Sequence, residues 1–324
     1  MTIDSNIMPE AGGSPHAETA EATAVVGLAV TRPFYWSVRR ELWEYRSIYI
    51  APLAAAAVVL VGFLIGAVNL PDAVRSMSRS DVTIQGVEHA NRLGLAAVAV
   101  MAATAMVVLV TGVIVGMFYG LGALHNERRD RSLLFWKSLP VSDLTAVAAK
   151  AAVPLVVLPV VTLAVVAVMH VIMLAVGTVV LLLNNIDPMA LWSQLPLVQM
   201  ALVLIWALVV TPLWLAPIYG WLFLVSAWAK RAPFLWAAFT PLAIIVVEGI
   251  AFRTHHFATL IGDRLTGALG AGFIHIPRAP DHGPRMPEID VLGFLGNPAL
   301  WIGLAVAAAF LAGAVWMRRT REPG

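Results

Sequence analysis

Two ionisable side chains lie inside long apolar runs, where they could transfer a proton or contact a transported molecule. His170 lies in the run VVAVMHVIMLAV, and Glu248 lies in the run PLAIIVVEGIAF. Ionisable groups are costly in lipid, so within membrane spans they usually face protein or water and serve a function. Both residues are therefore candidates for a gate or a substrate path. Structural alternatives stay open: a neutral His170 bonded to a neighbouring helix, and a Glu248 carboxylate that accepts backbone N–H groups where the chain leaves the membrane.

A second group of interest is the stretch from His125 to Lys150, HNERRDRSLLFWKSLPVSDLTAVAAK, which separates two apolar runs. Its charges begin with Glu127-Arg128, and Glu127 and Arg131 have the i,i+4 spacing of an ion pair on a helix. An unbroken apolar quartet follows, made of Leu133, Leu134, Phe135 and Trp136. In a water-facing loop such a quartet needs a cover. The membrane interface and a partner protein are the two alternatives.

The signatures of common enzyme sites are missing from this sequence. It contains no G-x-x-x-x-G-K-[ST] phosphate loop, no G-x-S-x-G nucleophile elbow and no H-E-x-x-H zinc helix. The histidines at positions 255, 256, 275 and 282 could be metal ligands, but adjacent histidines on a helix point about 100° apart. We therefore predict no metal site, no cofactor and no ATP hydrolysis by this chain. A net charge of +2 gives no indication of nucleic-acid binding.

The composition is that of a membrane protein. Of the 324 residues, 60% are hydrophobic and 12% are charged, whereas about 25% of a typical soluble domain is charged. Cysteine is absent, which excludes disulfides and thiolate metal sites. Residues 1–30 contain acidic residues but no Lys or Arg, so they lack the basic region of a signal peptide. We predict that they form a disordered cytoplasmic tail.

Six apolar runs are long enough to cross a bilayer, and they predict an all-α polytopic membrane protein. The spans are expected at about 48–70, 93–121, 144–183, 198–228, 234–252 and 299–317. The third exceeds the thickness of a bilayer, so it should begin in the cytoplasm near Asp143 and bend at Pro154 and Pro159. The fourth is also too long, and we expect Thr211-Pro212 and Pro217 to interrupt it.

Two further segments of the domain 31–324 are expected to lie outside the spans. Residues 31–46 place Phe34, Val38, Leu42 and Tyr45 on one side of a helix with the charged residues elsewhere, which predicts a helix in the membrane interface. The alternative is a cytoplasmic extension of the first span. Residues 253–298 form a long outer loop, in which Phe257 to Phe273 could be a short or re-entrant helix.

Basic residues predict the orientation of the spans. With the N-terminus inside, the inner segments hold 14 Lys and Arg residues and the outer segments hold 7. The inner ones are Arg32, Arg39, Arg40, Arg46, Arg128, Arg129, Arg131, Lys137, Lys150, Lys230, Arg231, Arg318, Arg319 and Arg321. We therefore predict a multi-pass protein of the cell (inner) membrane with both termini in the cytoplasm.

The stretch from Glu127 to Pro154 resembles the first cytoplasmic loop of type-2 ABC exporter permeases. The shared features are Glu127-Arg128, a short apolar–aromatic helix, Leu139-Pro140-Val141-Ser142, and then Lys150 with Pro154 opening a long apolar helix. The resemblance implies that residues 125–143 carry a coupling helix that docks into a separate ATPase subunit. It also implies a second permease subunit, in a homo- or heterodimer, and an outer cap at 253–298.

From the residues and this resemblance we predict the membrane subunit of an ATP-driven exporter. The ATPase-coupling residues would be Glu127, Arg128, Arg131, Leu133, Leu134, Phe135 and Trp136, and the lipid bilayer would be the other partner. The alternative is an intramembrane enzyme or a secondary transporter without an ATPase partner. The substrate is not encoded in a motif, although the few charges within the spans favour an amphipathic cargo.

Overall fold

The computed structural model describes residues 34–78, 86–129, 142–193, 195–274 and 287–320. The predicted tail at 1–30 lies outside these residues. So do Arg131 and the apolar quartet Leu133, Leu134, Phe135 and Trp136. The part of the predicted coupling loop that the structure describes consists of α5 (His125–Arg129) and the beginning of α7 (Asp143–Ala152).

The all-α fold class is confirmed, because six helices of the described residues are long and apolar enough to cross a membrane. Their boundaries lie within a few residues of the predicted spans, except that the helix of the second span extends further at both ends. The spans are α2 (Ser47–Ala67), α4 (Gly86–Gly122) continued by α5, α7 continued by η1 (Val153–Val157) and α8 (Leu158–Leu183), α10 (Leu197–Trp228), α11 (Pro233–Ala251) and α14 (Pro298–Thr320).

Short elements connect the spans. Residues 34–44 form a helix, and Tyr45 and Arg46 separate it from α2. At the opposite end of the bundle lie α3 (Leu70–Ser78) and α9 (Met189–Trp192). The segment predicted as an outer loop contains α12 (His256–Thr266), η2 (Gly267–Leu269), β1 (Phe273–Ile274), β2 (Glu288–Ile289) and α13 (Val291–Gly296), and β1 pairs antiparallel with β2.

Proline shapes the third and fourth spans differently. In the third span Pro154 lies within the π-helical turn η1, and Pro159 follows it at the beginning of α8. Proline has no backbone N–H and cannot close the α-helical hydrogen bond, and π-helical turns are one way to absorb the defect. The expected interruption of the fourth span is wrong, because α10 continues through Pro212 and Pro217. Neighbouring helices can stabilise a proline-containing helix in a membrane.

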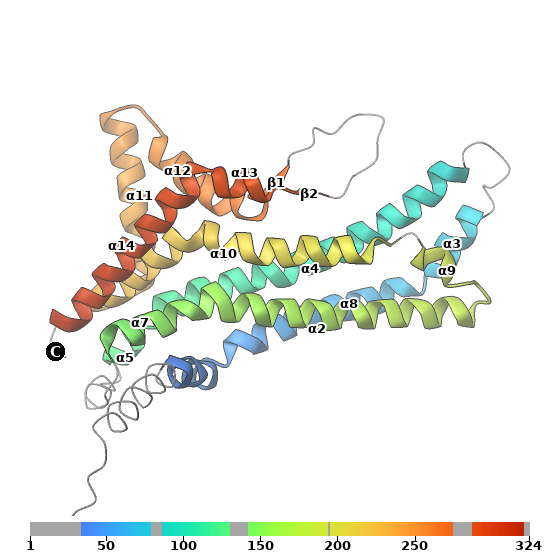
Figure 1. The fold of residues 1–324 in the computed structure, drawn as a ribbon, viewed down its shortest axis with the longest axis horizontal. Helices are drawn as coiled ribbons and strands as arrows, with labels where there is room; N and C mark the ends of the chain where they lie inside the picture. The colour runs from blue at the N-terminus through green and yellow to red at the C-terminus, as the bar shows by residue number, and fades with distance from the viewer. Residues whose placement is uncertain (1–33, 79–85, 130–141, 194, 275–286, 321–324) are drawn as a thin grey trace, which may run out of the picture.

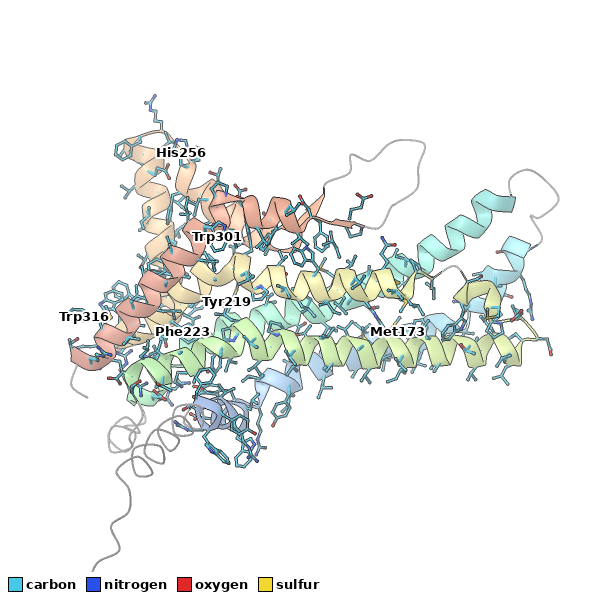
Figure 2. The ribbon with its side chains drawn as sticks, viewed as in Figure 1. Met173, Tyr219, Phe223, His256, Trp301 and Trp316 are labelled. Carbon is cyan, nitrogen blue, oxygen red and sulfur yellow. The ribbon has the colours of Figure 1, made fainter. Side chains whose placement is uncertain are left out.

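The six spans converge at one end of the molecule and fan out from it (Figure 1). We call the converging end, formed by residues 34–44, α5, α7 and the last turns of α14, the basal end. Its core contains Tyr119, Leu158 and Phe223, and Tyr219 and Phe223 lie inside the bundle in Figure 2. By contrast, α11 has no buried residue along its whole length.

Glycine allows close approach where the helices pack most tightly. A Cβ atom at Gly220 of α10 would lie 3.1 Å from the backbone of Ala307 of α14, and one at Gly112 of α4 would lie 2.8 Å from Thr162 Oγ1 of α8. These glycines therefore serve packing within one subunit. A Cβ at Gly62 or Gly66 of α2 would meet nothing within 4 Å.

A buried arginine fastens the segment between α11 and α14 to the bundle. Arg264 of α12 is 8% exposed, and its guanidinium lies 4.3 Å from the ring centroid of Trp214. It donates hydrogen bonds to the backbone carbonyls of Trp214, at 3.2 Å, and of Ala299. The indole of Trp206 adds a bond of 2.7 Å to the carbonyl of Gly272. The segment is thus attached to α10 and α14.

Candidate functional site

The basal end contains a cluster of charged side chains that is shielded from solvent. Lys150 of α7 is 2% exposed, and its Nζ lies 2.8 Å from Glu41 Oε1 and 3.1 Å from Glu127 Oε1. Glu41 and Glu127 are themselves 3% and 4% exposed. One ammonium group therefore joins two buried carboxylates from helix 34–44 and from α5. Buried charges of this kind persist only when they are paired and hydrogen-bonded.

Arg318 extends the cluster to the last span. Its Nη1 lies 2.7 Å from Glu127 Oε2, and its Nε lies 2.9 Å from Asp143 Oδ1. The hydroxyl of Tyr119, from α4, donates a 2.7 Å hydrogen bond to Glu41 Oε2. We call Glu41, Glu127, Asp143, Lys150 and Arg318 the basal ion cluster. It ties helix 34–44, α5, α7 and α14 together.

Local sequence places two of these groups on one face of α7. Ser142 caps the helix, because its Oγ accepts a hydrogen bond of 3.1 Å from the N–H of Thr145. Asp143 consequently lies in the first turn, and Lys150 follows two turns later on the same face. Asp143 can thus bind Arg318 while Lys150 binds Glu41 and Glu127.

Helix 34–44 exposes aromatic side chains and buries an acidic one. Its most exposed side chains include the aromatic residues Tyr35, Trp36 and Trp43, and the guanidinium of Arg39 lies 5.1 Å from the centroids of both tryptophans. Glu41, one of the charged residues expected outside the apolar side of the helix, is 3% exposed and points into the bundle. The pairing with Lys150 explains this burial. Exposed aromatic residues beside a basic side chain fit a membrane interface.

A tyrosine next to the cluster remains neutral. Tyr45 follows helix 34–44, and its ring packs edge-on against Tyr119 with centroids 4.9 Å apart. Its hydroxyl accepts a hydrogen bond of 3.4 Å from Asn126 Nδ2. Burial raises the pKa of the Tyr45 hydroxyl above its ordinary value. The ring therefore adds no negative charge to the cluster.

The residues just after α4 are fastened separately to the end of α10. The backbone N–H groups of Leu124 and His125 both donate to Ser226 Oγ, at 3.1 and 3.0 Å. The guanidinium of Arg128 donates to the carbonyl of Ser226 and, at 3.0 Å, to that of Ala229. This hydrogen-bonded contact, together with the basal ion cluster, holds the chain on both sides of residues 130–141.

The structure places two of the predicted coupling residues in these contacts. Glu127 belongs to the basal ion cluster, and Arg128 binds the end of α10. The Glu127 side chain is 4% exposed, so it is not a solvated helix end. The other coupling candidates, Arg131 and the apolar quartet, lie outside the described residues.

Glu248 makes the contacts of a structural tie. Its carboxylate accepts hydrogen bonds from Thr254 Oγ1 at 2.8 Å, from the N–H of His256 at 2.8 Å and from the N–H of Phe257 at 2.9 Å. It thereby caps the first turn of α12, whose N–H groups have no partner within the helix. These bonds correspond to the structural alternative proposed for Glu248. None of the residues that make them belongs to the basal ion cluster.

His170 bonds to a neighbouring span. Its Nε2 lies 3.1 Å from the carbonyl of Met101 and 3.4 Å from Thr104 Oγ1, both on α4. The contact with the carbonyl requires a proton on Nε2, so the ring is a donor there. These partners are those expected of a packing histidine. His170 and Glu248 thus lie on separate helices and in separate contacts, and the structure does not bring them together.

Sequence reasoning did not assign Glu41, Asp143, Lys150 and Arg318 to a site. Lys150 carried the clearest signal, because it is a lone cation close to a long apolar run and a cation in that position requires a partner. The paired residues are far apart in sequence: Lys150 pairs with Glu41 across 109 positions, and Arg318 pairs with Glu127 across 191 positions. Hydropathy alone cannot identify such partners.

A metal centre has no support within the described residues, which contain no group of three His, Asp or Glu side chains arranged to hold an ion. His255 and His256 adjoin the beginning of α12. The other two histidines of the sequence-based alternative, at positions 275 and 282, lie outside the described part of the chain.

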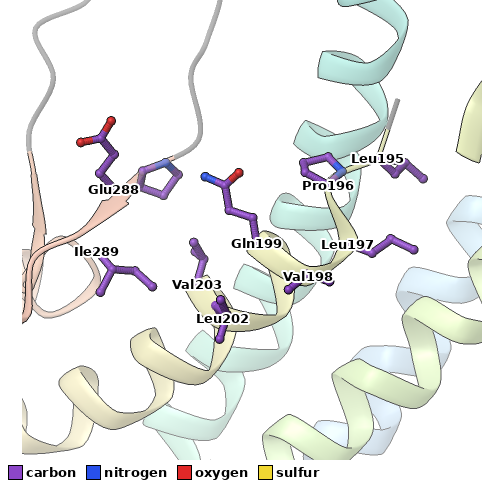
Figure 3. Close-up of a pocket in the computed structure, with 10 residues that line it drawn as sticks. Leu195, Pro196, Leu197, Val198, Gln199, Leu202, Val203, Glu288 and Ile289 are labelled. Carbon is purple, nitrogen blue, oxygen red and sulfur yellow. The ribbon is translucent and has the colours of Figure 1, made fainter. Parts of the chain in front are cut away.

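An apolar cavity lies at the other end of α10, away from the basal ion cluster (Figure 3). It has a volume of about 850 Å³ and lies between the first turns of α10 and the β2 strand. Gln199 and Glu288 contribute its polar side chains, and most of the remaining lining is apolar.

Comparison of the chain with protein-family models, with curated proteins and with solved structures finds no match.

Proposed function

We propose that this chain is the membrane-spanning permease subunit of an ATP-driven exporter. A separate ATPase subunit would dock on the 125–143 loop, and a second permease subunit would complete the transport path. Six spans supply a membrane path, and the sequence lacks a phosphate loop of its own. The resemblance of the 125–154 region to the coupling loop of type-2 ABC exporter permeases supports this assignment.

One observation carries the proposal: the segment 130–141 is flanked on both sides by residues fixed to several spans. On its N-terminal side, Glu127 binds Lys150 and Arg318, and Arg128 binds the end of α10. On its C-terminal side, Asp143 binds Arg318. A displacement of this segment would be transmitted to α4, α8, α10 and α14 together. A mechanical coupler needs a connection of this stiffness, whereas a simple connecting loop does not.

The apolar quartet supplies the part that a partner would cover. Leu133, Leu134, Phe135 and Trp136 lie within the segment that these contacts flank. Large aromatic side chains at the centre of a protein interface often contribute much of its binding energy. Docking of the quartet on an ATPase would therefore join the site of hydrolysis to the base of the bundle.

The proposed orientation places the basal end in the cytoplasm, where ATP is present. Arg318 and Arg319 end α14 at this side, and the predicted inner segments hold 14 of the 21 Lys and Arg residues. The apolar cavity at the far end of α10 would then lie near the outer surface. Its mainly apolar lining favours an amphipathic cargo over a small ion.

The proposal is tested by a photo-crosslinking amino acid placed at Trp136 in the native cell. We expect a crosslink to a P-loop ATPase, identified by mass spectrometry. Val68, exposed at the opposite end of α2, provides the matched control position and should give no ATPase crosslink. Failure to capture an ATPase at position 136, or equal capture at position 68, would contradict docking through this loop. An intramembrane enzyme or a secondary transporter would give such a negative result.

A further inference from the structure

A small cavity lies among α4, α8 and α10, inside the membrane-spanning part of the chain. Its volume is about 20 Å³, and Gly112, Thr162, Thr211 and Tyr219 are among its lining residues. Thr162 follows Lys150 by about three helical turns, or roughly 18 Å along the helix axis. The cavity is therefore separate from the basal ion cluster and lies well within the bundle.

Two hydroxyl groups at this cavity belong to side chains that are almost completely buried. Thr162 is 2% exposed and Tyr219 is 4% exposed. Among the hydrogen bonds of the described residues, none involves the hydroxyl of Thr162 or the hydroxyl of Tyr219. Leaving a buried hydroxyl without a hydrogen bond is unfavourable, and the great majority of such groups have a partner in protein or ordered water.

The same cavity contains further hydrogen-bonding capacity. Thr211 Oγ1 donates to the carbonyl of Ala268 at 3.3 Å and can still accept a hydrogen bond. Pro212 also lines the cavity, and its missing N–H leaves the carbonyl of Leu208 without its usual helical donor. In membrane helices, ordered water is one of the partners that satisfy backbone groups freed by proline.

We propose that this cavity is a binding site for a single water molecule that bridges the Thr162 and Tyr219 hydroxyls. A water needs roughly 10–15 Å³ of such volume and two to four polar partners. The cavity has the volume for one water, and the hydroxyls of Thr162, Thr211 and Tyr219 can provide its partners. The water would connect α8 to α10 through hydrogen bonds instead of direct packing.

The position of this site gives the water a mechanical role. The π-helical turn η1 immediately precedes α8, and Pro154 and Pro159 line the cavity beside it. A water bridge can exchange partners when helices shift, whereas interlocked apolar side chains cannot do so without opening a void. The site is thus a hydrated joint between two spans, and it does not depend on the proposed transport function.

A double-mutant cycle of Thr162→Val and Tyr219→Phe tests the bridge. Each variant keeps the side-chain shape but removes one hydroxyl, so a bound water would lose a partner. We expect each to raise the unfolding equilibrium constant in mixed micelles by about threefold to tenfold. Because both hydroxyls bind the same water, the double variant should raise the unfolding equilibrium constant by clearly less than the product of the two single increases. Thr111→Val is the matched control, because the Thr111 hydroxyl donates to the carbonyl of Val107 in its own helix.

A dry cavity predicts a different result. Removing a hydroxyl without a partner would then leave the protein equally or more stable, and the two effects would multiply independently. Either finding overturns the proposal. Should a variant fail to fold, a high-resolution density map of the unmodified protein decides: a solvent peak within hydrogen-bond distance of both hydroxyl oxygens supports the water, and a flat map there refutes it.

Discussion

Lys150→Met provides a quantitative test of the basal ion cluster. Methionine preserves most of the length of the side chain but removes the ammonium that lies 2.8 Å from Glu41 and 3.1 Å from Glu127. Breaking a buried ion pair by removing one partner typically destabilises a protein by about 3–5 kcal/mol. Arg318 still binds Glu127, and Tyr119 still donates to Glu41. We therefore expect a loss of stability at the lower end of this range, about 3 kcal/mol. This loss corresponds to an increase of roughly a hundredfold in the unfolding equilibrium constant.

The assay is reversible unfolding of the purified protein in mixed micelles, with two companion variants. Arg75→Met removes a cation that is 46% exposed and 3.7 Å from Asp72, so it should cost less than about 1 kcal/mol. Adding Glu41→Gln to Lys150→Met should recover part of the lost stability, because it removes one of the uncompensated charges. A Lys150→Met effect no larger than that of Arg75→Met, or no recovery with Glu41→Gln, would refute the reasoning.

Three further changes test orientation, packing and the role of Glu248. A periplasmic reporter inserted after Glu288 should be active and one after Ser138 inactive, and the reverse pattern would contradict the proposed orientation. Gly303→Ala would place a Cβ 2.7 Å from Arg264 Nη2 and should destabilise the protein by about 1–3 kcal/mol. A Cβ at Gly62 would meet nothing within 4 Å, so Gly62→Ala should leave stability unchanged. Equal losses of stability in the two variants would argue against tight packing at Gly303. Glu248→Gln should leave membrane insertion normal but speed amide exchange at His256 and Phe257, which donate to the carboxylate; unchanged exchange would exclude the tie.

The sequence was sufficient to predict the spans because lipid imposes a strong local requirement on composition. A run of about 20 apolar residues is needed to cross the hydrocarbon core, and the predicted boundary at Asp143 coincides with the first residue of α7. The continuity of α10 through Pro212 and Pro217 was not predicted. Whether proline breaks a helix in a membrane depends on the neighbouring helices, and their positions are not encoded locally.

The site was less predictable because its contacts join distant parts of the chain. Helical periodicity placed Glu41 outside the apolar side of helix 34–44, together with the other charged residues. Its partner Lys150 lies 109 positions later in the sequence, so no local pattern could reveal the pairing. Glu127 was selected for its charge and its position in the loop. Its burial also depends on Arg318 from the last span.

ATP hydrolysis by the purified complex of this chain and its ATPase is the most direct test of the coupling proposal. The decisive comparison is between the unmodified chain and a variant that combines Phe135→Ala with Trp136→Ala. We predict normal membrane insertion of this variant and no hydrolysis by the chain alone. Copurification with the ATPase, or substrate-stimulated hydrolysis, should be lost, because burial of two aromatic side chains at an interface can contribute several kcal/mol. Normal copurification and normal stimulated hydrolysis in the double variant would contradict coupling through this loop.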